Sequence, residues 1–151
     1  MRAVVQRVSK ASVSVEGQEV GVCGVGFVVW VAAHRNDTPA QAEKLAQRIA
    51  GLRIFNDEQG KMNLSLAEVP GSSVLAISNF TIYGETAKNR RPSFIEAAPF
   101  EAGKVLFDRF VETLRDLGTR VETGVFGAHM EVCAVNDGPV TVILDVPPSV
   151  E

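Results

Sequence analysis

The first part of the chain alternates hydrophobic and polar positions with the two-residue period of a β-strand. Valine-rich alternation runs through residues 2–8 and 11–16, and a shorter run covers residues 19–22. Gly17 and Gln18 separate the last two runs and favour a tight turn. The pattern therefore predicts an N-terminal β-hairpin.

A different pattern marks the centre of the expected sheet. Residues 27–33 are apolar without alternation, as in a strand that is covered on both faces, and this places Trp30 in the core. Another strand is predicted over residues 74–82. Its end carries residues 78–81, whose side chains can leave the core and meet a ligand there. Shorter strands are expected over residues 53–55, 120–122, 129–135 and 140–146.

Two segments carry the signals of α-helices. Thr38, Pro39 and Gln41 suit the N-cap, the first helical position and the capping box of one helix. A second helix is predicted to begin near Pro99 and to end before Gly118, with one apolar face and one charged face. The apolar positions of the two helices are Ala42, Leu45, Ala46, Ile49 and Leu52, and then Gly103, Leu106, Phe107, Phe110, Val111, Leu114 and Leu117.

Length and composition fit one folded domain. The 151 residues are 46% hydrophobic, which is enough to bury a sizeable core. We therefore expect a single domain over residues 1–151, of the α/β class in its α+β form. It would contain a mainly antiparallel twisted sheet or partial barrel with two main helices. Arg2 and Arg7 interrupt the N-terminal apolar residues, and no apolar run approaches the roughly 20 residues that span a bilayer. The expectation is a soluble cytoplasmic protein without a signal peptide.

The charged and metal-binding residue types argue against several functions. A net charge of −3 does not suit a protein that holds long stretches of nucleic-acid backbone. Cys23 and Cys133 lie far apart without a neighbouring histidine, so we expect neither a disulfide nor a metal site, and both thiols should be small core residues. Lys88, Arg90 and Arg91 form a basic loop, for which solvated surface is the simplest interpretation.

The familiar catalytic constellations are missing from the sequence. It contains no GxSxG elbow, no Cys-His pair and no recognisable carboxylate dyad. The glycine-rich residues 21–26 lack the Lys-Ser/Thr of a phosphate loop and precede a strand instead of a helix. These features argue against nucleotide hydrolysis, and they leave a site built largely from main-chain groups.

One unusual segment is Val-Asn-Asp-Gly-Pro-Val-Thr at residues 135–141, which lies between two apolar strand patterns. Pro139 lacks an N–H donor and fixes φ, while Gly138 lets the backbone approach another group closely. Such a dipeptide can present bare main-chain carbonyls to a ligand. Asn-Asp-Gly-Pro is also strong turn chemistry, so a simple hairpin turn is the alternative.

Three motifs occur in order along the chain. They are the opening residues 1–8, Ser-Asn-Phe-Thr-Ile-Tyr-Gly at residues 78–84, and Asn-Asp-Gly-Pro-Val-Thr at residues 136–141. Together they closely resemble the D-aminoacyl-tRNA deacylases. Asn79 stands where that family usually has glutamine, and Ile82 replaces a leucine. The likeness covers nearly the whole chain and includes residues 52–55, 89–94 and 121–128.

The resemblance implies hydrolysis of the ester that joins a D-amino acid to the terminal adenosine of tRNA, without a metal or an organic cofactor. Mischarged glycyl-tRNA is a further substrate that it suggests. In the family, the carbonyls of the residues that match Gly138 and Pro139 capture the α-amino group, and their cis bond blocks an L side chain. In proteins of the family, this dipeptide of one chain lies in the pocket of a second copy, which implies a homodimer. The basic loop would then contact phosphates near the end of the tRNA.

The resemblance also implies roles for individual residues. Ser78, Phe80 and Thr81 would line the pocket at the adenosine and the ester, with the N–H of Phe80 as a candidate oxyanion donor. Thr81 is either a nucleophile or a positioning residue, and we favour positioning because no base lies beside it in the sequence. Expected substrate-binding positions are Arg7, which would hold the Gly-Pro segment, Asn79, Phe126 and Met130, which would pack against the adenine, and Asn136. Core packing is the alternative for the two apolar residues, and solvated surface is the alternative for the arginine.

Two other functions are compatible with the same residues. Editing of L-alanine on the wrong tRNA uses the same fold with a trans Gly-Pro bond, although Phe80 and the Asn-Asp-Gly-Pro-Val-Thr form favour the D-specific activity. From another class, the chain could be a non-catalytic dimeric module that binds a nucleotide or a small ligand in the same pocket. Release of free D-amino acid from charged tRNA separates these hypotheses.

Overall fold

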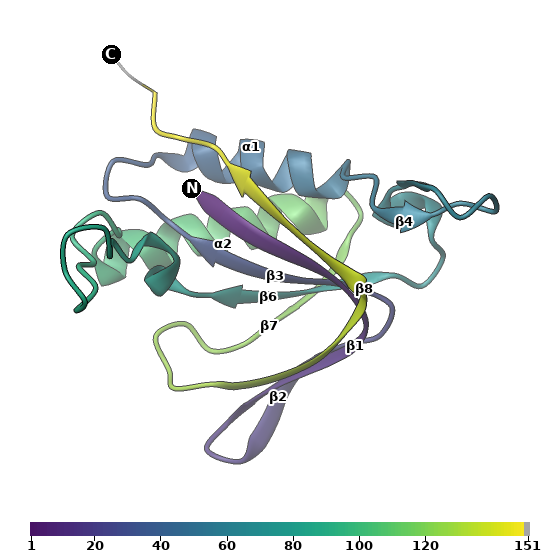
Figure 1. Ribbon diagram of the computed structural model, residues 1–151, viewed down its shortest axis with the longest axis horizontal. Helices are drawn as coiled ribbons and strands as arrows, with labels where there is room; N and C mark the ends of the chain where they lie inside the picture. Colours follow the sequence, from purple (N-terminus) through teal and green to yellow (C-terminus); the bar gives the residue numbers. More distant parts are fainter. Residues whose placement is uncertain (150–151) are drawn as a thin grey trace.

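The computed structural model describes residues 1–149 of the chain (Figure 1). Its strands and helices largely follow the hydrophobic pattern, because alternating runs form strands and helix-spaced runs form helices. In chain order the elements are β1 (Arg2–Val15), β2 (Gln18–Cys23), β3 (Gly26–Ala32), α1 (Pro39–Ala50), β4 (Phe55–Asn56), β5 (Met62–Leu64), η1 (Leu66–Glu68), β6 (Ser73–Ser78), η2 (Phe80–Tyr83), α2 (Phe100–Asp116), β7 (Arg120–Thr123) and β8 (Glu131–Asp145).

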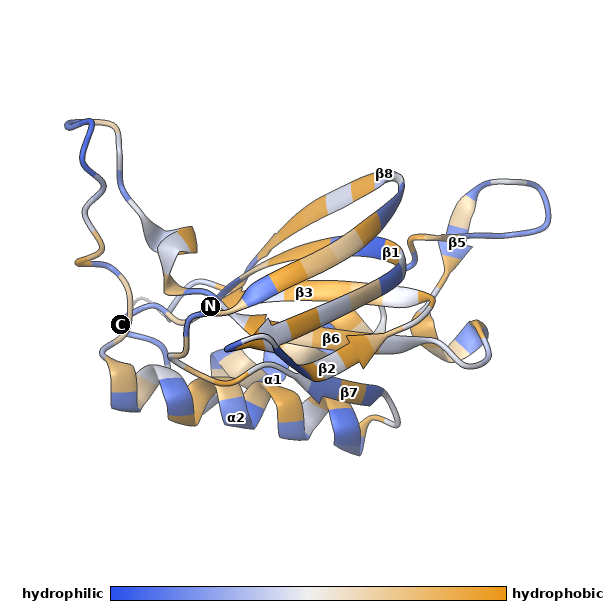
Figure 2. Cartoon of the chain, turned by 90° about the horizontal axis from the view of Figure 1, so that it is seen from below, coloured by the Kyte–Doolittle hydropathy of each residue, from blue (hydrophilic) through white to orange (hydrophobic). Residues whose placement is uncertain are grey.

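The main sheet is curved and nearly closed, as the predicted partial barrel requires. Its strands follow the order β2-β1-β3-β6-β7, and β8 also pairs with β1. The β3–β6 and β6–β7 pairs are parallel, whereas β1 pairs antiparallel with β2, β3 and β8. Both helices lie along one side of this sheet, and the small β4–β5 hairpin projects from one end (Figure 2). The predicted α+β architecture with two main helices is confirmed.

The two helices begin and end close to the predicted positions. At the start of α1 the side-chain oxygen of Gln41 accepts hydrogen bonds from the Thr38 N–H at 2.8 Å and from the Thr38 hydroxyl at 2.7 Å. Pro39 occupies the first turn, where a missing N–H costs nothing. The predicted strand over residues 53–55 is displaced, because β4 covers only Phe55–Asn56.

The longest strand pair, β1 with β8, contains the Gly-Pro segment. Along this pair Gln6 lies opposite Thr141 and Val8 lies opposite Asn136, so residues 137–140 bulge from the ladder. The strands predicted separately on either side of the bulge are one strand in the structure, and the hairpin-turn alternative is wrong. A strand can continue here because both of its halves pair with the same partner, which a local turn propensity does not reveal.

The core consists of two clusters on opposite faces of the sheet. The larger cluster fills the space between the sheet and the helices and includes Phe27, Leu45 and Phe110. The smaller cluster lies inside the curve of the sheet and includes Val28 and Ile77. Successive side chains of a strand point to opposite faces, so β3 contributes to both clusters.

Two core predictions are wrong. Trp30 shares a face with Val28, but it lies at the open end of the smaller cluster, where it is half-buried and its indole N–H donates to the Gln6 side chain at 3.1 Å. Cys133 is exposed, because its partner Ser12 on β1 points away from the core. Cys23 is buried as predicted, and burial raises the pKa of its thiol.

Within residues 1–149, no helix has the length and apolar character needed to cross a membrane.

Candidate active site

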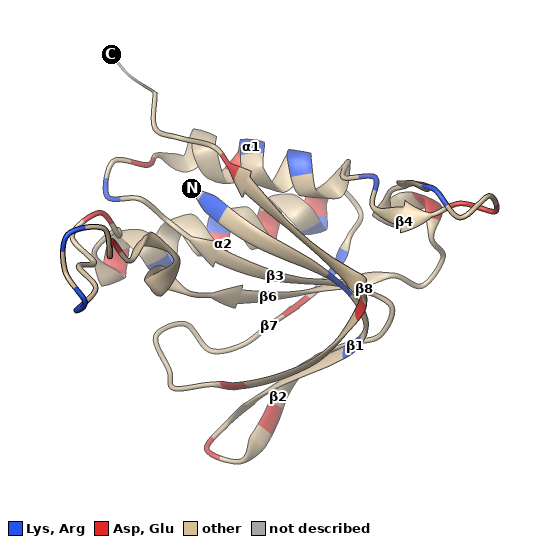
Figure 3. Cartoon of the chain, viewed as in Figure 1, with Lys and Arg blue, Asp and Glu red and all other residues tan. Residues whose placement is uncertain are grey.

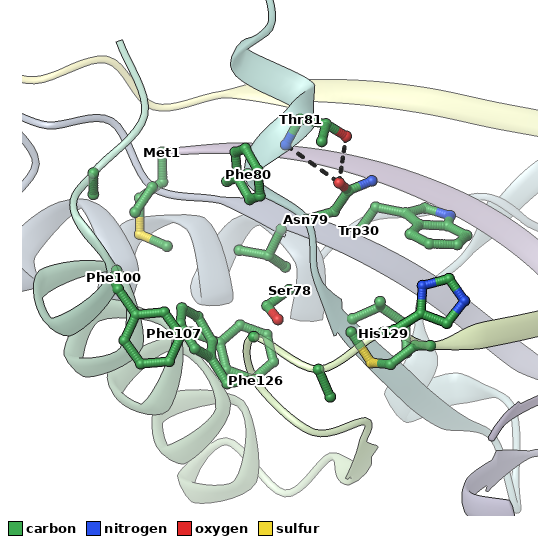
Figure 4. Close-up of a pocket in the computed structure, with 18 residues that line it drawn as sticks. Met1, Trp30, Ser78, Asn79, Phe80, Thr81, Phe100, Phe107, Phe126 and His129 are labelled. Atoms are coloured by element: carbon green, nitrogen blue, oxygen red, sulfur yellow. Dashed lines mark hydrogen bonds between the residues drawn. The ribbon is translucent and has the colours of Figure 1, made fainter. Parts of the chain in front are cut away.

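A cavity of about 660 Å³ opens where β3 and β6 end (Figure 4). The residues from the end of β6 and the start of η2 form one wall, and the first turns of α2 form another. The segment between β7 and β8 closes a third side. The predicted residues Ser78, Asn79, Phe80, Thr81, Phe126 and Met130 all line this cavity.

The end of β6 sets the direction of the first wall. β6 pairs in parallel with β3 up to Ser78, and the Asn79 N–H then donates to the carbonyl of Val31 at 2.8 Å. The strand predicted to continue to residue 82 therefore ends at Ser78. The chain turns here because the Asn79 side-chain oxygen accepts from the Thr81 N–H at 3.3 Å and from the Thr81 hydroxyl at 2.5 Å, which caps η2.

This cap places Phe80 and Thr81 at the mouth of the cavity. The Phe80 side chain is 58% exposed, so its ring is accessible at the rim of the cavity. Its N–H is the first of the helical turn and has no acceptor within η2. A main-chain donor at a cavity rim is suited to binding an oxyanion.

Aromatic side chains form the opposite wall. The ring of Phe126 meets Phe100 edge-to-face at a centroid distance of 5.1 Å, and it lies 5.9 Å from the ring of Phe107. Phe126 also packs against the larger core cluster, so its two proposed roles, core packing and pocket wall, coexist. Met130 packs against the smaller cluster in the same way.

Several lining residues escaped the sequence analysis. Trp30, Phe100, Phe107 and His129 line the cavity, and so does the Met1 side chain. Met1 opens the first of the three motifs, but the other four residues belong to none of them. The sequence carries one signal of this wall, the phenylalanines Phe94, Phe100 and Phe107 spaced closely around the start of α2.

The cavity lining carries almost no charge. Among the described residues that line it, none is Asp, Glu, Lys or Arg, and His129 is the only residue with a titratable ring. Tyr83 lies nearby in η2, against His34 and beneath the Arg2 guanidinium. Burial raises the pKa of the Tyr83 phenol well above its usual value, so this group stays protonated and is no base. The arrangement favours positioning and main-chain donors over acid–base chemistry by paired carboxylates.

Arg7 lies elsewhere and is buried, with 7% of its surface exposed. Its guanidinium donates to the carbonyl of Asp137 at 3.0 Å, to the carbonyl of Ile54 at 2.8 Å and to the side-chain oxygen of Asn56 at 3.0 Å. Arg7 therefore joins β1, the bulge of β8 and the β4 segment. Solvated surface is the wrong interpretation for this residue.

Asn136 closes the bulge from within. Its side-chain NH₂ donates to the carbonyl of Val140 at 3.1 Å, and its side-chain oxygen accepts from the Val140 N–H at 3.0 Å. The amide thus replaces the ladder bonds that residues 137–140 cannot make. The enclosed Gly138-Pro139 bond is cis, as the resemblance led us to expect.

The predicted site residues therefore fall into two groups. Ser78, Phe80 and Thr81 line the cavity, whereas Gly138 and Pro139 are exposed and do not line the cavity of their own chain. Arg7 and Asn136 belong with the second group. Among residues 1–149 no cluster of three or more His, Cys, Asp or Glu side chains could hold a metal ion.

Comparison with known proteins agrees with this geometry. The family model for D-Tyr-tRNA(Tyr) deacylase matches residues 4–145. The chain belongs to this family. The D-aminoacyl-tRNA deacylase of Thermotoga petrophila is 55% identical over 145 residues, which cover 96% of this chain and 97% of that protein. The protein of the same name from Thermomicrobium roseum is 57% identical over 145 residues, covering 96% and 94%.

Two solved structures share the fold. The structure of a c-Myc DNA unwinding element binding protein superposes with a TM-score of 0.90 at 37% identity, covering 97% of this chain and 99% of that chain. The structure of a probable eukaryotic D-amino acid tRNA deacylase superposes with a TM-score of 0.83 at 20% identity, covering 96% and 98%.

We predict that Asn136→Asp weakens the bulge without unfolding the protein. The carboxylate keeps the shape of the amide but cannot donate to the Val140 carbonyl, which it repels. Deacylation of D-aminoacyl-tRNA should fall by about tenfold or more, since losing this part-buried hydrogen bond and leaving its acceptor unpaired costs roughly 1–3 kcal/mol. Asn36→Asp adds the same charge at an exposed residue and is the matched control. Equal rates for the two variants would show that the Asn136 amide does not support the reaction.

Proposed function

We propose that the protein hydrolyses the ester between a D-amino acid and the terminal adenosine of tRNA. Water adds to the ester carbonyl, the bond to the ribose oxygen breaks, and free D-amino acid and tRNA are released. The observation that carries the proposal is membership of the D-Tyr-tRNA(Tyr) deacylase family over residues 4–145. Mischarged glycyl-tRNA is a second substrate that the site would accept, because glycine has no side chain to exclude.

The cavity is suited to this substrate. Its size is in the range of a small-molecule site, and its aromatic wall at Phe126 offers an apolar surface for an adenine ring. An aminoacyl ester is already activated, so holding water in line and stabilising the developing oxyanion can supply most of the catalysis. We assign the contact with the oxyanion to the N–H of Phe80. Ser78 would line the pocket where the adenosine and the ester bind.

Thr81 is a positioning residue in this proposal. Its hydroxyl donates to the side-chain oxygen of Asn79, and an amide oxygen is not a base that could activate it. Asn79 would act through the same contact, because it fixes the turn that carries Phe80 and Thr81.

We further propose that two copies form a homodimer in which the Gly138-Pro139 segment of one lies in the cavity of the other. The support is that this segment is exposed and lies outside its own cavity. On the same strand Val135 and Ile143 are also exposed apolar residues, at 47% and 68%. The carbonyls of Gly138 and Pro139 would accept bonds from the substrate ammonium, and the same backbone would collide with an L side chain. Arg7 and Asn136 would hold this segment in place.

The proposal is tested by hydrolysis of matched D- and L-tyrosyl-tRNA by the purified protein. We expect the D ester to be cleaved at least roughly 100-fold faster than the L ester, because steric exclusion acts on the whole side chain. Faster cleavage of L-alanyl-tRNA than of any D ester would assign the chain to the related editing activity. Binding of charged tRNA without hydrolysis of either ester would make it a non-catalytic module.

The role of Thr81 has its own test. If Thr81 only positions the substrate, Thr81→Ala should retain D-tyrosyl-tRNA hydrolysis within about tenfold in single-turnover measurements, whereas loss of a nucleophile costs roughly 1,000-fold or more. Thr81→Ser keeps the hydroxyl and serves as the control. Detection by mass spectrometry of an acyl group on Thr81 would contradict the positioning role.

A further inference from the structure

The loop from Gly84 to Ala98 connects two sides of the cavity. It begins directly after η2, the turn that carries Phe80 and Thr81, and it returns at Ala98, which also lines the cavity. The Ala98 N–H donates to the carbonyl of Ala33 at 2.9 Å, which fixes the returning end to the chain after β3. Both ends of the loop are therefore fixed at the rim of the cavity.

The outer part of this loop is a small hairpin. Glu85 and Ser93 exchange two backbone hydrogen bonds, of 2.8 Å and 3.0 Å, and residues 86–92 form an exposed tip beyond them. At the base of the hairpin the Phe94 ring meets Phe80 edge-to-face at 5.2 Å. The base of the hairpin therefore packs against Phe80, the rim residue whose N–H we assign to the oxyanion.

Positive charge gathers at this tip. Lys88, Arg90 and Arg91 lie within four residues of one another, in a chain whose net charge is −3 (Figure 3). None of the three forms an ion pair with the rest of residues 1–149. The two nearby carboxylates are occupied, since Glu85 accepts from the Ala87 N–H at 2.5 Å and Glu96 pairs with His34 and Arg35.

Unpaired cations on an exposed arm beside a nucleoside pocket are suited to phosphate groups. Single-stranded RNA offers one phosphate per nucleotide, and cations that contact phosphates give sequence-independent affinity. No residue of the tip lies more than four residues from Glu85 or Ser93, so the tip reaches at most roughly 14 Å beyond the base of the hairpin. At about 3.4 Å of stacked strand per nucleotide, this reach covers about four nucleotides next to the terminal one.

We infer that the tip of this loop, through Lys88, Arg90 and Arg91, binds the backbone phosphates of the few nucleotides that precede the terminal adenosine of the substrate RNA. The inference rests on the proposed function, because it takes the cavity as the site of that adenosine. The loop then supplies affinity for the polynucleotide, while the cavity performs the reaction. The three cations act by binding substrate and do not touch the ester.

The test replaces all three cations by glutamine and compares two substrates. On D-tyrosyl-tRNA the triple variant should lose about tenfold or more in kcat/KM, mostly through KM, because each lost phosphate contact weakens binding. On 3′-O-(D-tyrosyl)adenosine, which has no phosphate, its rate should equal that of the unaltered protein. The control triple variant, Lys44→Gln with Lys61→Gln and Arg120→Gln, removes the same charge at other exposed positions.

Salt dependence provides a readout that does not need catalysis. For uncharged tRNA, the plot of log affinity against log salt concentration should be shallower by about 2 in the loop variant. Each of the three phosphate contacts contributes roughly 0.7 to that slope. An unchanged slope, or an equal loss of activity on the phosphate-free ester, would overturn the inference. If the unaltered protein hydrolyses neither ester, the proposed function fails, while the slope still reports whether the loop binds phosphate.

Discussion

The position of the Gly-Pro bulge depends on a buried cation, the guanidinium of Arg7. Burying a charge is costly unless hydrogen bonds replace its water, and here the carbonyls of Asp137 and Ile54 and the side chain of Asn56 do so. These acceptors come from segments far apart in the sequence. A single side chain therefore ties the bulge of the outermost long strand to the body of the domain, and it leaves the Gly-Pro segment exposed but supported.

The cavity follows from a second constraint, the abrupt end of β6. A parallel strand in the middle of the sheet delivers Ser78 to the sheet edge, and the Asn79 cap then turns the chain so that Phe80 and Thr81 face the opening. Asn79 stands where the resemblance led us to expect glutamine, and its side chain makes the cap. The absence of charged side chains from the described lining explains why no catalytic constellation could be recognised in the sequence.

Elements governed by local contacts could be predicted from the sequence. The start of α1 is one example, since Thr38 and Gln41 lie within one helical turn. The continuity of β8 could not be predicted, because Asn-Asp-Gly-Pro by itself favours a turn. The strand continues because both of its halves pair with β1 and because the Asn136 side chain makes two hydrogen bonds with Val140 across the bulge. Trp30 was misplaced for a similar reason: its apolar neighbours indicate burial, but only the tertiary fold shows that its end of the sheet is open.

In the proposed dimer, a complete site combines the cavity of one chain with the Gly-Pro bulge of another. Complementation tests it directly: Ala128→Trp fills a cavity-lining position, Asn136→Asp weakens the bulge, and the two variants are co-expressed with different tags. Each variant alone should be impaired. Random pairing makes about half of the dimers mixed, each with one intact site, so about a quarter of the unaltered activity should return. Activity no higher than the mean of the separate variants would contradict the claim.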